Sequence, residues 1–504
     1  MSAWEGLRHG FGIALTLPHL AYALLGAALG TAVGVLPGIG PAMTISLLLP
    51  VTFGVEPTGA LILFAGIYYG AMYGGSTTSI LLNAPGESAT VVTAVEGYQM
   101  ARRGRGGAAL ATAAIGSFVA GNIGTLLLAV AGPRLAQGAL WLGPAEYFGL
   151  IVVAFVAVAA STSNVPAKSG LALCIGLTIG AIGIDAQTGR SRLTFGIPQL
   201  LDGIDIVVVA VGLFAIGEIL YAAWSGAEMV DAVVVERGRL GLSRADWRRS
   251  WPAWLRGTAI GFPIGAIPAG GAEIPTLLSY ALERRLTKYP EEFGQGAIEG
   301  VAGPEAANNA SAAGTLVPLL ALGLPTTATA AMILAAFQQF GLQPGPLLFR
   351  DAPDLVWGLV ASLLIGNAML VLLNLPLVGI WVRLLKVPGP LLNAGVLVLS
   401  TVGTFAMHRS VVDVAILFAI GWLGFLLRRF AVPLVPVIVG AILGPLAEQH
   451  LERALAVADG HWIALLQRPG SAALLALAAA IALWSIRRTR RGTTVSSYDP
   501  IGRA

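Results

Sequence analysis

Oxygen-bearing side chains gather in two stretches of a chain that is otherwise apolar. The first runs from Tyr73 to Thr93, YGGSTTSILLNAPGESATVVT, and the second from Glu299 to Thr329, EGVAGPEAANNASAAGTLVPLLALGLPTTAT. Both combine the helix breakers Pro and Gly with Asn, Ser, Thr and a carboxylate. Within a bilayer, interrupted backbone persists only where protein buries it or where it lines a wet cavity. Two such stretches, one in each half, predict a transport site where two repeats meet.

The first chemistry that these residues suggest is cation binding. Hard cations such as sodium take oxygen ligands, and broken membrane helices supply them. Glu305 and Asn309 are four positions apart and therefore share a helix face. An ionisable residue inside a membrane is a functional candidate by default. The predicted ion-binding residues are Asn83, Glu87, Glu305, Asn309 and Ser311.

Each of these residues also has a structural alternative. Ser and Thr hydroxyls commonly bond back to their own helix turn. Glu305 follows Pro304, so it could simply complement the dipole at the start of a helix. Glu273 lies in the second half, and the corresponding position of the first half is uncharged. The predicted repeat therefore gives no support to a role for Glu273 in binding.

The second chemistry is binding of an anionic substrate. Neither stretch contains Lys or Arg. A carboxylate would therefore be held by backbone N–H groups at half-helix N-termini after Gly86, Pro304 and Pro325, by hydroxyls and by co-bound cations. This pattern favours uptake coupled to Na⁺ or H⁺. The predicted substrate-binding residues are Ser76, Thr77, Thr78, Asn83, Gly86, Ser88, Asn308, Asn309, Pro325, Thr326 and Thr327.

Enzyme chemistry has little support in the sequence. The five histidines are scattered, and HExxH, GxSxG and GxxxxGK patterns are absent. We therefore expect no metal, no cofactor and no catalytic residues. An alternative function is that of a membrane-embedded enzyme acting on a lipid-linked substrate, but neither the polar cluster around Asn83 nor the one formed by Glu305, Asn308, Asn309 and Ser311 has His, Cys or a carboxylate pair. A third is a structural or sensory subunit without flux.

The composition is that of an integral membrane protein. Of 504 residues, 56% are hydrophobic and 11% are charged, whereas soluble proteins have about 25% charged residues. Apolar runs of about 20 residues, the length that crosses a bilayer, occur about twelve times. The predicted fold is an all-α polytopic membrane protein with broken or re-entrant helices. Basic residues lie in short clusters between spans, so the lipid bilayer is the expected environment and nucleic acid is not an expected partner.

A short motif predicts two internal repeats. The segment GTAVGVLPGIGP from Gly30 and the segment GFPIGAIPAGG from Gly261 share the order Gly, three residues, Gly, two residues, Pro, two residues, Gly. Loop charges do not decide between parallel and inverted repeats, although inverted repeats are the commoner arrangement. The predicted helix breaks are at Pro37, Gly38, Gly40, Pro85, Pro268 and Gly271.

The expected organisation follows from these repeats and from the positive-inside rule. Clusters of Lys and Arg indicate cytoplasmic connections, so the C-terminus is predicted to be cytoplasmic. No removable signal peptide is evident at the N-terminus. The predicted segments are a first half (1–224), a cytoplasmic connection (225–256), a second half (257–430), C-terminal transmembrane helices (431–486) and a cytoplasmic tail (487–504).

Several runs resemble the large membrane subunit, the TctA family, of the tripartite tricarboxylate transporter system. They are GVLPGIGP, YGAMYGGSTTSILLNAPGE, EGYQMARRGRGGAALA, EGVAGPEAANNASAAGTLVPLLALGLP and GLQPGPLL. The resemblance covers about residues 15 to 485 and implies a permease of the bacterial inner membrane. It also implies a small four-helix membrane subunit and an extracytoplasmic solute-binding protein as partners, and ion-gradient-driven uptake of carboxylates such as citrate.

The chain departs from the family pattern near the predicted site. Thr326 and Thr327 follow Pro325 where a Gly-Ser pair is common, and Gln99 stands where a Pro is usual. Hydroxyl placement at a predicted anion-binding turn is therefore altered. Tricarboxylate is one candidate substrate among several carboxylates.

Overall fold

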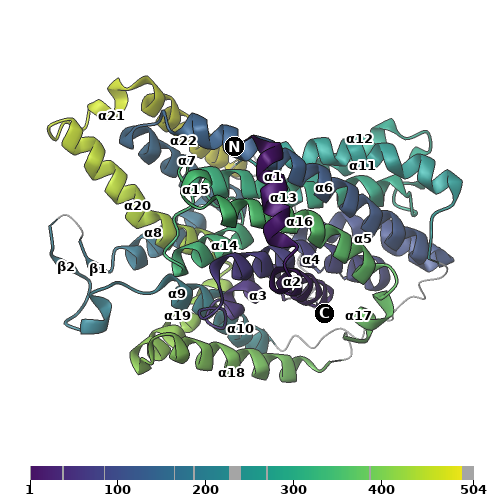
Figure 1. Cartoon of the computed structure of the whole chain (residues 1–504), viewed down its shortest axis with the longest axis horizontal. Coiled ribbons are helices and arrows are strands. Elements are labelled where there is room, and N and C mark those ends of the chain that lie inside the picture. Colours follow the sequence, from purple (N-terminus) through teal and green to yellow (C-terminus); the bar gives the residue numbers. More distant parts are fainter. Residues whose placement is uncertain are drawn as a thin grey trace. The chain divides into compact units, whose positions relative to one another are not determined.

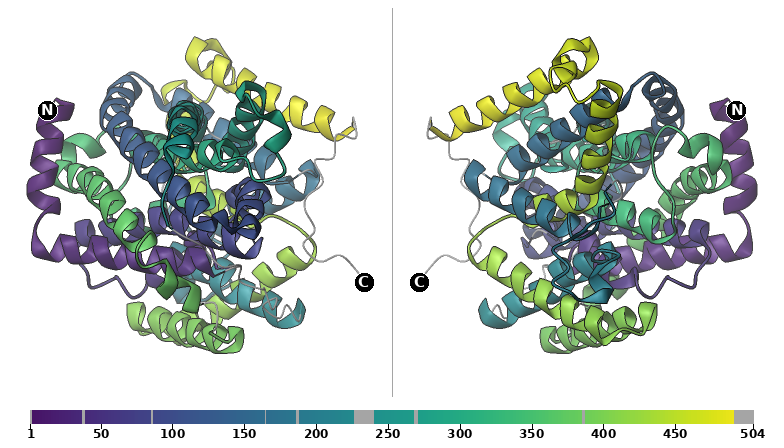
Figure 2. Two further views of the ribbon diagram at one scale, coloured as in Figure 1. Left: turned by 90° about the vertical axis from the view of Figure 1, so that its right-hand side faces the viewer. Right: turned by 90° about the vertical axis from the view of Figure 1, so that its left-hand side faces the viewer.

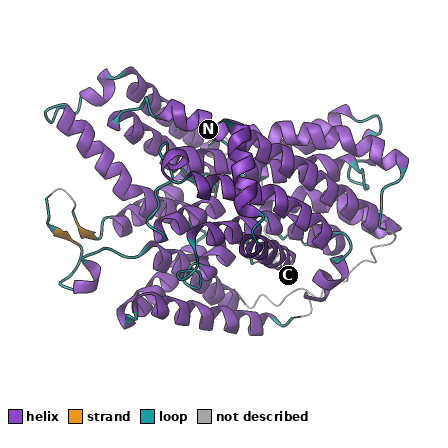
Figure 3. Ribbon diagram, viewed as in Figure 1, coloured by secondary structure: helices purple, strands orange, loops and turns teal. Residues whose placement is uncertain are grey.

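The structure, a computed structural model, describes residues 2–490 except 37–38, 85, 164, 186–187, 226–239, 268–270 and 385–386. Four predicted helix breaks, Pro37, Gly38, Pro85 and Pro268, lie outside the described residues, as does most of the predicted tail. The described chain is almost entirely helical (Figures 1 and 3). The prediction of an all-α polytopic membrane protein is confirmed.

Eight segments within the described residues are long and apolar enough to cross a membrane. They are Leu17–Val35, Ser88–Ala139, Pro144–Thr162, Ile206–Ser225, Pro353–Asn374, Gly389–His408, Val411–Arg429 and Pro469–Arg487. Four further helices of 22 to 26 residues, α4, α11, α13 and α20, carry more polar residues. The predicted number of about twelve spans stays a prediction.

The chain divides into two compact units. The first comprises residues 1–140 and 207–425, and the second comprises residues 141–206 and 426–504. Each unit therefore draws on two separate parts of the sequence, whereas the predicted halves are continuous in sequence.

The first unit contains most of the helices. They are α1 (Ala3–Ala14), α2 (Leu17–Val35), α3 (Pro41–Leu48), α4 (Pro57–Leu82), η1 (Ser88–Thr90), α5 (Val91–Met100), η2 (Ala101–Arg105), α6 (Gly106–Ala139), α9 (Ile206–Val211), η4 (Gly212–Ile216), α10 (Gly217–Ser225), α11 (Arg244–Gly265), α12 (Glu273–Leu286), η5 (Pro290–Glu292), α13 (Glu299–Leu322), α14 (Ala328–Gln339), α15 (Leu348–Asp351), α16 (Pro353–Asn374), α17 (Val378–Leu384), α18 (Gly389–His408) and most of α19 (Val411–Arg429).

The second unit is smaller. It consists of α7 (Pro144–Thr162), α8 (Pro166–Gly180), η3 (Pro198–Leu200), α20 (Val435–Val457), α21 (Ala464–Gln467), α22 (Pro469–Arg490) and a two-stranded antiparallel sheet of β1 (Gly183–Ile184) and β2 (Ser191–Arg192). The C-terminal helices, yellow in Figure 2, pack against α7 and α8.

Two helix pairs in the first unit each pack through three glycines that are spaced four residues apart. In the pair α2 and α4, a methyl group on Gly30 would lie 2.4 Å from the carbonyl oxygen of Ile67. In the pair α11 and α13, a methyl group on Gly261 would lie 2.3 Å from the carbonyl oxygen of Ala307. Gly26 and Gly34 make equivalent contacts in the first pair, as do Gly257 and Gly265 in the second. Such approaches leave no room for a side chain, so these glycines set the distance between the helices.

The elements that follow each pair also correspond. α2 and α11 are followed by the short helices α3 and α12, while α4 and α13 end in left-handed residues, Asn83 (φ 55°) and Gly323 (φ 70°). Between the pairs, the Tyr68 hydroxyl lies 3.2 Å from Thr315 Oγ1, and Ser76 Oγ lies 2.5 Å from Glu305 Oε2. Residue numbers rise along α4 as they fall along α13, so these two helices run antiparallel.

The predicted cytoplasmic connection (225–256) contains the start of a helix, while its location stays a prediction. α11 begins at Arg244, inside the range 225–256, because Ser243 and Asp246 form a capping box at its start. The prediction used the arginines here as a marker of the cytoplasmic side. Two of them bind carboxylates, since Arg249 contacts Glu292 and Glu299, and Arg256 contacts Glu283.

Candidate functional site

Glu305, in the first half of α13, joins the two oxygen-rich stretches. Its carboxylate is fully buried and accepts hydrogen bonds from Ser76 on α4 and from Thr93 on α5. The Ser76 bond is 2.5 Å long. An ionised carboxylate in such surroundings is costly unless hydrogen-bond donors face it. The structure thus brings two predicted residues, Glu305 and Ser76, into direct contact across the two halves, while their roles in binding stay predictions.

The first break follows α4 and is tightly held. Asn83 ends α4 in the left-handed conformation and its side chain is exposed, a backbone state that Asn tolerates better than most residues. A methyl group on Gly86 would lie 2.2 Å from the carbonyl oxygen of Gly34, so only glycine fits between α4 and α2. Glu87 follows, and its Oε1 atom is buried without a hydrogen-bond partner among the described residues.

The second break follows α13 and leads into α14. Pro325 and Thr326 are buried, and Thr326 Oγ1 lies 3.4 Å from the carbonyl oxygen of Gly265. Thr327 is the N-cap of α14, and its hydroxyl accepts the N–H of Ala330 at 3.1 Å. One of the free N–H groups at this helix start is therefore bound within the protein.

Buried polar atoms without partners gather on these helices. Within the described residues they include Tyr73 OH, Glu87 Oε1, Asn309 Oδ1 and both amide atoms of Asn308. A buried polar group that lacks a partner costs about 1–3 kcal/mol. Water, an ion or a substrate that supplied hydrogen bonds or coordination would remove this cost, so the unpaired atoms mark the region as a candidate binding site.

Other predicted residues use their hydrogen bonds within their own helices. Thr78 Oγ1 donates to Gly75 O at 3.1 Å, and Ser311 Oγ donates to Asn308 O at 2.7 Å. Thr77 is buried, and Ser88 is exposed with its hydroxyl 2.5 Å from Glu273 Oε1. The hydroxyl hydrogens of Thr78 and Ser311 thus bond back to their own helix turn, which was the structural alternative to a role in binding.

The remaining predicted breaks also have defined positions. Gly40 is the N-cap of α3, and Gly271 has φ 50° just before α12. Both lie directly before or just ahead of a short helix, α3 or α12, while their role as helix breaks stays a prediction.

Glu273, which the sequence analysis left out of the predicted site, lies in contact with a residue of that site. It begins α12, accepts the Ser88 hydroxyl and lies within electrostatic range of Glu87. Its counterpart in the first copy is uncharged, so symmetry gave no signal. Its position just after the second Gly-rich break was the available clue.

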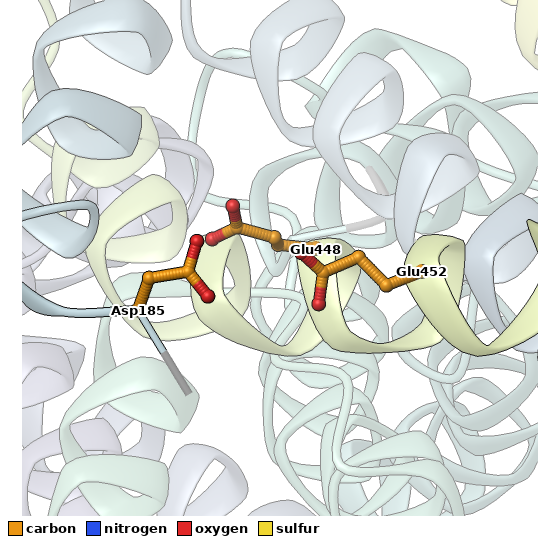
Figure 4. Close-up of side chains that lie close together, drawn as sticks. All are labelled: Asp185, Glu448 and Glu452. Atoms are coloured by element: carbon orange, nitrogen blue, oxygen red, sulfur yellow. The ribbon is translucent and has the colours of Figure 1, made fainter. Parts of the chain in front are cut away.

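A separate acidic cluster lies in the second unit. Asp185, Glu448 and Glu452 offer carboxylate oxygens within 4.8 Å of one another, as Figure 4 shows. Arg192 binds both oxygens of Glu448, at 2.5 and 3.0 Å, and lies 3.7 Å from Asp185. The guanidinium therefore offsets part of the negative charge of this cluster.

Comparison with known proteins identifies the family. Residues 20–439 match the profile described as "Tripartite tricarboxylate transporter TctA family". A protein of Agrobacterium vitis described as "Uncharacterized 52.8 kDa protein in TAR-I ttuC' 3'region" is 45% identical over 503 residues, which cover 99% of this chain and all of that protein. A second protein of this organism, described as "Uncharacterized protein in TAR-II ttuC' 3'region", is 42% identical over 214 residues, which cover 42% of this chain and 88% of the relative. No solved structure matches. With the family profile matching most of its length, the chain belongs to the tripartite tricarboxylate transporter TctA family.

Proposed function

We propose that this chain is the permease subunit of a binding-protein-dependent secondary transporter that imports a carboxylate together with Na⁺ or H⁺. The observation that carries this proposal is the buried contact of Glu305 with Ser76 and Thr93, which joins the two interrupted stretches. A carboxylate inside a membrane protein at such a meeting point is typical of an ion pathway. Membership of a transporter family agrees with it.

The proposed architecture is a pair of inverted repeats. Gly30 and Gly261 are 231 positions apart, and their contacts Ile67 and Ala307 are 240 positions apart. The neighbouring contacts of Gly34 with Ala71 and of Gly265 with Ser311 keep the same spacings. Because α4 and α13 run antiparallel, the matching units would have opposite orientations, and the substrate would bind where they meet.

The proposed substrate site lies at the two breaks. Backbone N–H groups at the starts of η1 and α14 would face the carboxylate, with hydroxyls such as Thr326 nearby. Each helix N-terminus contributes only about half a positive charge. Because neither stretch contains Lys or Arg, a co-bound cation would be required for charge balance. We place Glu87 and Glu305 among its ligands.

The proposed partners and location follow from the family. A small four-helix membrane subunit and an extracytoplasmic binding protein would complete the transporter in the bacterial inner membrane, with the C-terminus of this chain in the cytoplasm. The binding protein would concentrate a substrate that the permease captures weakly on its own.

Uptake into vesicles tests the proposed function. Vesicles with both membrane subunits receive a labelled carboxylate, with or without the binding protein, and ionophores then collapse the Na⁺ or H⁺ gradient. We expect uptake to require the binding protein and one gradient. Uptake that is equally fast without the binding protein and without either gradient would indicate a facilitative channel and would contradict the proposal.

A matched pair of variants tests the role of Glu305. We expect Glu305→Ala to abolish uptake while the protein remains near its normal abundance in the membrane, since the carboxylate serves the ligand rather than packing. Glu291→Ala, which removes an exposed carboxylate, should transport normally. Normal uptake by Glu305→Ala would remove this residue from the site.

A further inference from the structure

One exposed side of α11 carries arginines and tryptophans that the transport site does not use. We call these residues the α11 stripe: Arg244, Trp247, Arg248, Trp251 and Leu255, all of which are exposed. Their spacing of three or four residues places them on the same side of the helix. From the start of α11 onward, the stripe changes from arginine to tryptophan and then to leucine. A helix that enters a bilayer from water passes through the environments that suit these residues in the same order, which is phosphate groups, interface and hydrocarbon.

The two tryptophans fit the interfacial layer of a membrane. At about 1.5 Å per residue, Trp247 and Trp251 are about 6 Å apart along the helix axis. The interfacial layer on each side of a bilayer is about 5–8 Å thick, because a bilayer of about 40–45 Å has a hydrocarbon core of about 30 Å. Each tryptophan is 48% exposed, and no described residue accepts a hydrogen bond from either indole N–H. Both N–H groups are therefore available to lipid ester groups or interfacial water, as in the aromatic belts of membrane proteins.

Neighbouring arginines on α11 have opposite surroundings. Arg249 is partly buried and binds Glu292 and Glu299, each at 2.6 Å. Arg244 and Arg248 are exposed, and neither forms an ion pair with a carboxylate of the described residues. The positive charge of the α11 stripe is therefore not balanced by the part of the chain that the structure describes, and it lies on the surface of the helix.

The helix α12 adds basic residues at the same end of α11. The two helices lie side by side, as Figure 1 shows. They run antiparallel, because Arg256 binds Glu283 within α12 while Arg249, two turns earlier, binds Glu292 beyond the end of α12. The exposed residues in the first half of α12 are mostly aliphatic, whereas those at its end and just after it are mostly basic. The exposed basic residues there are Arg284, Arg285 and Lys288. Both helices thus change from apolar to basic toward the same end.

We propose that the α11 stripe binds the headgroup of an anionic phospholipid. Arg244 and Arg248 would donate hydrogen bonds to the phosphate, since a guanidinium matches phosphate oxygens in geometry and charge. Trp247 and Trp251 would lie at the level of the ester groups, and Leu255 would contact the acyl chains. A soluble anion would account for the arginines but not for the ordered change to tryptophan and leucine. The binding requires that the chain lie in a membrane, and it does not depend on the proposed function.

Native mass spectrometry of the purified full-length protein tests the surface. The protein is released from mixed micelles that contain equal amounts of phosphatidylglycerol and phosphatidylcholine with identical acyl chains. We expect the bound lipid to be mainly phosphatidylglycerol. Arg244→Gln and Arg248→Gln should each weaken phosphatidylglycerol binding about fivefold relative to phosphatidylcholine, which is the effect of one basic residue near a membrane surface. Arg248→Lys keeps the charge and should retain most of the preference.

A matched control separates this surface from net charge. Arg350→Gln also removes one exposed guanidinium, but Arg350 is paired with Asp351 at 2.9 Å. We expect this variant to keep the full preference for phosphatidylglycerol. Because all three arginines are exposed, none of the Gln variants removes a packed side chain, and their melting temperatures should equal that of the unmodified protein.

Two results would overturn the proposal. One is equal binding of the two lipids by the unmodified protein, which is also the result expected if another protein subunit rather than lipid covers the α11 stripe. The other is an equal preference in Arg248→Gln and Arg350→Gln. Neither result bears on carboxylate uptake. Conversely, a preference that depends on Arg244 and Arg248 would stand even if vesicles accumulated no carboxylate.

Discussion

Replacement of Glu96 should be among the most destabilising single changes in the first unit. Glu96, near the end of α5, is completely buried. Its carboxylate accepts the N–H groups of Gly294, Gly296 and Ala297 and the hydroxyl of Tyr280. All three backbone partners lie between η5 and α13, so one side chain organises a loop that is about 200 positions away in the sequence.

The size of the loss follows from which donors become unpaired. Gly294 is exposed and can bind water, whereas Ala297 is buried and Gly296 is partly buried. A buried donor left unpaired costs about 1–3 kcal/mol, and hydrogen bonds to a charged group are at the upper end. Counting Gly296, Ala297 and the Tyr280 hydroxyl, we expect Glu96→Ala to lower the free energy of unfolding by about 3–5 kcal/mol.

Denaturation of the purified protein in mixed detergent micelles measures this loss. Glu96→Gln keeps one acceptor oxygen and should lose roughly half as much, while Glu291→Ala removes an exposed acid from the same loop and should be neutral within about 0.5 kcal/mol. A loss below about 1 kcal/mol for Glu96→Ala would refute the reasoning, because it would mean that water satisfies the loop N–H groups.

Two further predictions concern the first break and the topology. We expect Asn83→Gly to transport normally. Asn83→Ala should lose about 0.5–1 kcal/mol of stability, since φ 55° is strained for Ala. Loss of uptake in a stably folded Asn83→Gly would instead show that the side chain is a ligand, as the sequence analysis predicted. Cysteines placed at Arg103, Arg244 and Arg490 should react with a membrane-impermeant reagent only from the cytoplasmic side, and labelling of any one of them from outside would contradict the predicted orientation.

The sequence predicted those features that depend on local pattern. The Gly and Pro order after Gly30 and Gly261 predicted two internal repeats, which stay a prediction, although both glycines pack against a partner backbone in the structure. The polar stretches predicted that Glu305 and Ser76 belong to one region, and they are in contact. Local pattern is informative here because close packing of helices requires small residues at fixed spacing.

Features that depend on distant partners were missed. Nothing near Glu96 indicates that its acceptors serve residues 294–297, and nothing near Asn367 indicates that it packs on Gly121. The exposure of Asn83 was also not predicted, because the same Asn suits both a ligand and a left-handed helix end. The start of α11 at Arg244 was not predicted, although the Ser243 and Asp246 capping box was visible in the sequence.

The proposed repeats share a scaffold but not a chemistry. With the spacing of 240 positions that relates the glycine contacts of α4 to those of α13, Glu305 corresponds to Ala65, and Ser76 corresponds to Leu316. The carboxylate therefore comes from the second half alone and its hydroxyl partner from the first half alone. Asn308 and Asn309 similarly correspond to Tyr68 and Tyr69. A symmetric backbone would bring both breaks to the same place, while these asymmetric side chains would allow one half to hold the ion and the other to complete its surroundings. Relative movement of the halves would then change the surroundings of Glu305 directly, because its hydrogen-bond donors are on the opposite half.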